Sequence, residues 1–165
     1  MPHPKEADLE ALLQSLVDAG VEFIVVGGAA AVLHGAPTTT QDLDILHRRT
    51  PENVARLVTV LDGLDAVVRE PGSRRLRATI AALEGPGQHN LSTDLGPLDP
   101  LGTLHDGRGY DDLIGKSVLM EDGTLRIQVI DLDTLIGIKS STGRNKDKLL
   151  VPILIALRSE IEGSG

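Results

Sequence analysis

The stretch VVGGAAAVLHGAPTTTQDLDIL, residues 25–46, decides the expected fold. Its first residues complete the nearly continuous apolar run 21–26, which is typical of a short buried strand. Gly27 and Gly28 follow, and the small residues after them favour a short helix. Residues 42–46 then alternate between polar and apolar, as a half-buried strand does. The stretch therefore predicts a strand, a glycine turn, a short helix and a second strand.

Two acidic residues lie two positions apart on the second of these strands. Because side chains alternate between the faces of a strand, Asp42 and Asp44 should project to one face while Leu43 and Ile45 point into the core. Neighbouring carboxylates repel each other unless a cation or a proton intervenes. Hard oxygen ligands suit Mg²⁺ or Mn²⁺. The alternative is that the pair is solvated surface at a strand edge.

Gly27 and Gly28 stand where the first strand feeds the helix. Without side chains there, a phosphate can approach the backbone N–H groups, and the start of a helix favours negative charge. The pair does not fit the G-x-G-x-x-G pattern of dinucleotide binding, since Ala29 and Ala31 break the spacing. A structural turn is the alternative reading. A metal site beside a phosphate site suggests reaction at a phosphorus centre assisted by two metal ions.

The rest of the chain predicts alternating helices and strands. We expect helices over 6–19, 51–61, 131–140 and 146–160, a helical turn over 110–114, extended segments over 90–93 and 98–101 around a turn at 95–97, and a hairpin formed by 117–120 and 125–130. Residues 64–69 are a weak strand candidate, and 76–83 fit either a short helix or a strand. The order is not strictly βαβ. We therefore expect an α/β or α+β fold with a mixed central sheet flanked by helices, in a single domain spanning residues 1–165.

Composition limits the classes of function. Aromatic residues make up 1% of the 165-residue chain, so the core should be aliphatic, and stacking of single-stranded bases is disfavoured. The absence of cysteine excludes disulfides and thiolate chemistry. A net charge of -8 argues against tight non-specific binding to nucleic acid. With no long apolar run and a charged N-terminal segment, we expect no membrane contact and a cytoplasmic location.

The run from Gly27 to Asp44 resembles the signature of the polymerase-β-like nucleotidyltransferases, in which a Gly-Gly or Gly-Ser pair precedes Asp-x-Asp. Residues 89–99, HNLSTDLGPLD, are similar to the segment that bears the third carboxylate of that family. Residues 135–147 resemble the C-terminal helical region of its minimal bacterial members, some of which are toxin or antitoxin components. The resemblance implies a nucleotidyltransferase fold.

The resemblance also implies roles for three acids. Asp42 and Asp44 would hold Mg²⁺ or Mn²⁺, and Asp99 would be the third metal-binding and catalytic carboxylate, helping to deprotonate an acceptor hydroxyl. Asp94 is the alternative third acid, although it has a ready structural use before a turn.

A nucleoside triphosphate such as ATP is the implied second ligand. Its phosphates would contact six positions: Gly27, Gly28, Thr38, Lys139, Arg144 and Lys146. The alternative for Lys139 is an ordinary solvated side chain or an ion pair with Asp133. For Arg144 and Lys146 the alternative is an ion pair with Asp147.

The implied activity is metal-dependent transfer of a nucleoside monophosphate to a hydroxyl acceptor. Two departures weaken the match, because Gly28 replaces a frequent serine and Thr38 replaces a frequent arginine, and both changes remove a donor. The alternative function is a catalytically weakened binding protein, such as an antitoxin or a partner subunit. The acceptor stays open among tRNA, a protein side chain and a small molecule. A partner protein or a homo-oligomer is expected to supply further acceptor surface.

Overall fold

The computed structural model describes residues 2–69 and 75–163. Within these ranges the strands are β1 (Phe23–Val26), β2 (Leu43–His47), β3 (Val67–Val68), β4 (Leu91–Thr93), β5 (Gly96–Leu101), β6 (Ser117–Asp122) and β7 (Leu125–Ile130). The helices are α1 (Leu9–Asp18), α2 (Gly27–Leu33), α3 (Pro51–Gly63), α4 (Ile80–Glu84), α5 (Tyr110–Leu113), α6 (Leu132–Ser141) and α7 (Asn145–Gly163), with a 3₁₀ turn, η1, at Ile114–Lys116.

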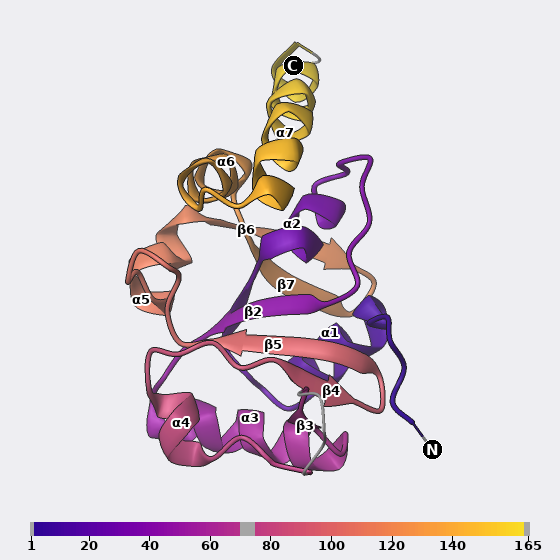
Figure 1. Ribbon diagram of the computed structural model, residues 1–165, viewed down its shortest axis with the longest axis vertical. Coiled ribbons are helices and arrows are strands. Elements are labelled where there is room, and N and C mark those ends of the chain that lie inside the picture. Colours follow the sequence, from indigo (N-terminus) through magenta and orange to yellow (C-terminus); the bar gives the residue numbers. More distant parts are fainter. Residues whose placement is uncertain (1, 70–74, 164–165) are drawn as a thin grey trace.

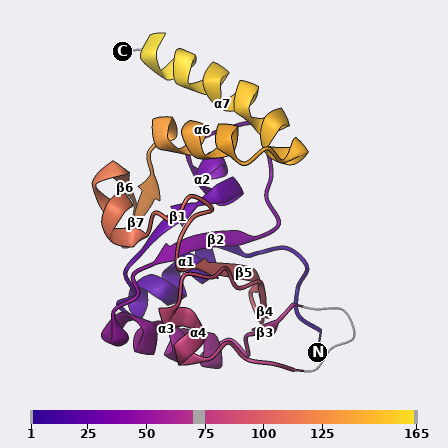
Figure 2. The same ribbon diagram turned by 60° about the vertical axis from the view of Figure 1, so that its left-hand side comes forward.

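The described strands form one mixed sheet in the order β3-β4-β5-β2-β1-β7-β6. β1 pairs antiparallel with β2 and parallel with β7, and β2 pairs parallel with β5. Figures 1 and 2 show α2, α6 and α7 at one end of the molecule and α3 and α4 at the other. The expected mixed sheet flanked by helices is confirmed, and β2 lies at its centre.

Helix starts follow local capping chemistry. The Asp8 side chain accepts from the Ala11 amide at the start of α1, and Thr50 caps α3 ahead of Pro51. Asp131 caps α6 by accepting from the Thr134 amide, so the helix begins one residue later than expected. These caps fix the ends of the helices that carry the core.

Several local expectations are corrected or refined. The turn between β4 and β5 lies at residues 94–95, so Gly96 and Pro97 belong to β5. Within 64–69 only Val67–Val68 pairs as a strand, and helix α4 takes only the end of 76–83. Helix α2 begins at Gly27 itself, and Asp42 immediately precedes β2.

The core is almost entirely aliphatic, as the composition predicts, and Phe23 is its aromatic member. Strands β1 and β2 contribute fully buried residues such as Ile24 and Ile45, which anchor the centre of the sheet. Among the residues described, no helix combines the length and the apolar character needed to cross a membrane.

Candidate functional site

Three carboxylates converge at the centre of the sheet. Asp44 lies on β2 opposite Asp99 on the parallel strand β5, and Asp42 lies just before β2. Paired residues on neighbouring strands project to the same face, so register brings Asp44 and Asp99 together across 55 positions of sequence. One oxygen from each of Asp42, Asp44 and Asp99 lies within 4.8 Å of the others. Such a set could hold a divalent cation.

Asp99, and not Asp94, belongs to this group. Asp94 lies in the turn that precedes β5, and its carboxylate is 3.5 Å from the His3 ring, in a separate cluster with Asp65. The Asp65 carboxylate there is already paired with two arginines, Arg75 and Arg77. Of the two candidates for the third acid, only Asp99 therefore lies beside Asp42 and Asp44.

The environment of Asp44 favours a cation. Its Oδ1 atom is buried and, among the described residues, finds no hydrogen-bond partner. Burial raises the pKa of Asp44 and the Asp42 carboxylate raises it further, while Lys139 opposes both. An orphaned carboxylate oxygen is costly unless a proton or a metal satisfies it. The donor set and this orphan atom fit Mg²⁺ or Mn²⁺.

Arg69 is a residue of the site that sequence reasoning missed. Its Nη2 atom donates to both oxygens of Asp99, at 3.0 and 3.2 Å, and lies 3.6 Å from Asp42 Oδ2. Its Nη1 atom donates to the Leu91 carbonyl. The Asp99 side chain is only 3% exposed, so this guanidinium is its main compensating charge. The sequence offered no signal beyond one arginine at the end of a weak strand.

Gly27 and Gly28 each lie close to a different side chain. Gly27 has a φ of +66°, and a Cβ there would overlap the carboxylate of Asp44. A Cβ at Gly28 would lie 2.9 Å from Thr40 Oγ1, whose hydroxyl donates to the Asp42 carbonyl. A side chain at position 28 would therefore crowd Thr40, which packs against this glycine from the loop before β2.

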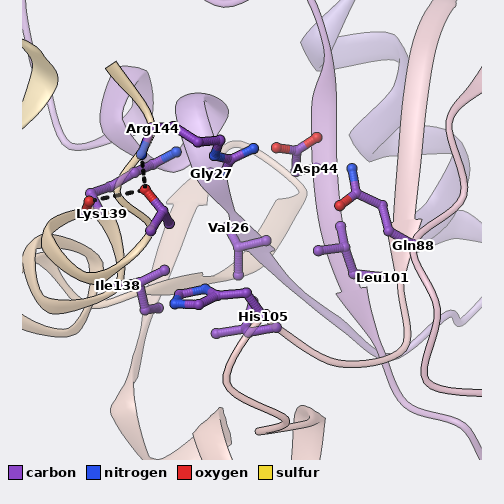
Figure 3. Close-up of a pocket in the computed structure, with 11 residues that line it drawn as sticks. Val26, Gly27, Asp44, Gln88, Leu101, His105, Ile138, Lys139 and Arg144 are labelled. Carbon is purple, nitrogen blue, oxygen red and sulfur yellow. Dashed lines mark hydrogen bonds between the residues drawn. The ribbon is translucent and has the colours of Figure 1, made fainter. Parts of the chain in front are cut away.

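A cavity of about 320 Å³ opens beside Asp44 (Figure 3). Gly27, Lys139 and Arg144 line it, and His105 and Ile138 contribute to its wall. The remaining predicted phosphate contacts line an adjacent cavity of about 340 Å³, which shares Lys139: they are Gly28, Thr38 and Lys146. The structure thus distributes the predicted phosphate-binding residues over two cavities.

Lys139 is paired, although not with the residue considered from the sequence. Its Nζ atom donates to Asp147 at 3.0 Å, with both side chains buried, whereas Asp133 pairs with Arg158. Arg144 also donates to Asp147, as the alternative reading of that arginine expected. Since an ammonium has three donors, Lys139 keeps two for another ligand. Asp147 therefore orients both cations beside the first cavity.

Asp99 should make stability depend on pH. Burial and the nearby Asp44 carboxylate raise the pKa of Asp99 to about 7, against opposition from Arg69. Between about pH 4 and pH 7 the folded protein then holds a proton on Asp99 that the unfolded chain releases, so rising pH lowers the free energy of unfolding.

In chelator, the free energy of unfolding of the parent should fall by roughly 2–4 kcal/mol more than that of Asp99→Asn across this window. Urea unfolding at intervals of pH would measure the difference. Parallel pH profiles for the two proteins would contradict the assigned environment of Asp99.

Solved structures provide the comparison for this fold. No protein-family model matches the sequence, and no curated protein matches it. A candidate nucleotidyltransferase of Thermotoga maritima superposes with a TM-score of 0.55 at 19% identity, covering 94% of this chain and 91% of that one. The chain has a nucleotidyltransferase fold. A lincosamide antibiotic adenylyltransferase, LnuA, solved with lincomycin bound, superposes with a TM-score of 0.60 at 12% identity, over 93% of this chain and 99% of that one.

Proposed function

We propose that this protein is a metal-dependent nucleotidyltransferase that moves a nucleoside monophosphate from a nucleoside triphosphate to a hydroxyl acceptor and releases pyrophosphate. The observation that carries the proposal is the meeting of Asp42, Asp44 and Asp99 beside a cavity lined by cationic side chains. The fold supports it, since both structural neighbours are named for nucleotidyl transfer. The proposal includes one domain over residues 1–165 and a cytoplasmic location.

The acidic and the basic side chains of the site have different roles in the proposed reaction. Asp42 and Asp44 would hold Mg²⁺ or Mn²⁺, which neutralises phosphate charge and assists attack at phosphorus. Lys139 and Arg144, both oriented by Asp147, would bind the triphosphate by charge-assisted hydrogen bonds. Asp99 would accept the proton of the acceptor hydroxyl, since a base with a pKa near 7 suits this role.

A second candidate function is that of a catalytically weakened binding protein, such as an antitoxin of the minimal bacterial branch or a partner subunit. Arg69 favours it, because a guanidinium paired with Asp99 resembles a structural ion pair as much as a catalytic one. In this case a partner chain or a second copy would contact the protein without nucleotidyl transfer.

Transfer of label separates the two functions. The protein would be incubated with each α-labelled nucleoside triphosphate and Mg²⁺, with tRNA, protein or small hydroxyl compounds as acceptors. Lincomycin belongs in the last class, because LnuA was solved with it bound. Label that reaches an acceptor, and fails to reach it in chelator, supports the enzyme. Metal-dependent binding of the triphosphate without transfer to any acceptor class would favour the binding protein.

A further inference from the structure

The Arg69 guanidinium lies where a cation shared by Asp42 and Asp99 would lie. Its Nη2 atom is 3.0 Å from the first oxygen of Asp99, 3.2 Å from the second and 3.6 Å from Asp42 Oδ2. The Asp44 oxygen that lacks a partner is not among its contacts. Two of the acids are therefore in different states among the described residues: Asp99 is in an ion pair with Arg69, while one buried oxygen of Asp44 has no hydrogen-bond partner.

Hydrogen bonds fix both the backbone and the guanidinium of Arg69. Its backbone N–H donates to the Asn90 carbonyl at 2.8 Å, and its Nη1 atom donates to the Leu91 carbonyl at 2.6 Å. Both acceptors belong to the chain at β4, which pairs with β3 through Val67 and Val68. Because the fork of the guanidinium is fixed at one nitrogen, the other is aimed at Asp99. The pairing of β3 with β4 thus positions the ion pair between Arg69 and Asp99.

A second metal ion and this guanidinium would compete for the same oxygens. An arginine side chain stays protonated at any ordinary pH, and Mg²⁺ binds its oxygen ligands at about 2.0–2.1 Å. A metal ion bound to Asp99 would therefore be repelled by the fixed positive charge of Arg69. When the three acids are ionised, one divalent ion and one guanidinium balance their charge.

We propose that Arg69 takes the place of a second metal ion, so that the centre binds one divalent cation, held by Asp42 and Asp44. The inference rests on the proposed function and changes the two-ion expectation drawn from the sequence. Asp99 is then fixed by an arginine and is free of metal. Arg69 acts as a positioning residue for that carboxylate.

Counting bound Mn²⁺ tests this directly. Equilibrium dialysis would use the full chain with saturating ATP analogue that carries a methylene bridge between its α and β phosphates. The parent should bind one Mn²⁺ per chain. Arg69→Met, which keeps much of the length and loses the charge, should bind two, and the dipolar broadening of a close Mn²⁺ pair should enter its electron paramagnetic resonance spectrum.

Two matched variants serve as controls for the metal count. Arg69→Lys keeps a positive charge and should bind one ion. Arg126→Met removes an exposed arginine that pairs with Glu121 on the β6–β7 hairpin, and should also bind one. Two ions in the parent, or one ion in a folded Arg69→Met, would overturn the role of Arg69 while leaving the proposed function standing. A parent that binds no Mn²⁺ with the analogue would overturn both.

Discussion

Asp99→Asn should lower turnover by about 10²–10⁴-fold, the range typical of losing a general acid or base. The substitution nearly preserves shape and removes the group placed to accept the proton of the acceptor hydroxyl. Nucleotide binding should change much less, because Asp42, Asp44 and the cations of the cavity are retained. Single-turnover rates with labelled triphosphate, together with the affinity for the triphosphate, would separate the two effects.

Asp94→Asn is the matched control. Asp94 lies five residues earlier, is exposed, and belongs to the His3 and Asp65 cluster. Its substitution should leave turnover unchanged and cost at most about 1 kcal/mol of stability through the turn. If Asp94→Asn abolished transfer and Asp99→Asn did not, the third acid would be wrongly assigned.

Gly27→Ala should destabilise the protein by roughly 2–5 kcal/mol, combining backbone strain with overpacking. The strain arises because φ at Gly27 is +66°, and the overpacking because the new Cβ would overlap the Asp44 carboxylate. Displacement of that carboxylate should also remove the binding of metal with nucleotide. Chemical denaturation in chelator and calorimetry with Mg²⁺ would measure the two losses.

Gly123→Ala isolates the contact from the strain. Gly123 has a similar φ of +61°, but a Cβ there meets no atom within 4 Å. It should cost about 1–2 kcal/mol, the left-handed penalty alone, and metal binding should be retained. Equal losses of stability at the two positions would show that Gly27 matters only for its backbone conformation.

The central part of the fold was predictable because its signals are local. Strand β1, the glycine pair and the Asp-x-Asp at the start of β2 lie within residues 23–46, where periodicity and residue type suffice. The start of α3 was equally predictable, since Thr50 and Pro51 are neighbours in sequence, whereas α1 begins at Leu9 and not at residue 6 as expected. Predictions of this kind need no knowledge of how strands pair.

Long-range geometry was less accessible. Asp99 was preferred from the resemblance, but its position opposite Asp44 depends on the parallel register of β2 and β5. Arg69 reaches the acids only because β3 pairs with β4, and no local pattern records that. No local pattern predicts the contact between Thr40 and Gly28 either. This contact explains why a residue without a side chain is favoured at position 28.

The Lys139 partner illustrates a third limit. Asp133, earlier on the same helix, was the partner considered from the sequence, yet the chain turns between α6 and α7 and brings Asp147 onto Lys139 instead. Burial then decides the pairing, because a buried ammonium needs a buried carboxylate. A sequence pattern cannot show which of two nearby acids becomes buried.

The central claim is that Asp44 is kept in an unfavourable environment in order to bind metal and nucleotide. Thermal melts of the parent and of Asp44→Asn, each in chelator and in Mg²⁺ with a nucleoside triphosphate, test it most directly. The account predicts that Asp44→Asn melts at the same or a higher temperature in chelator, since one buried, repelled charge is gone. It also predicts that the variant loses most of the stabilisation that Mg²⁺ and nucleotide give the parent. A variant that melts lower in chelator, yet is stabilised by Mg²⁺ and nucleotide as much as the parent, would contradict the account.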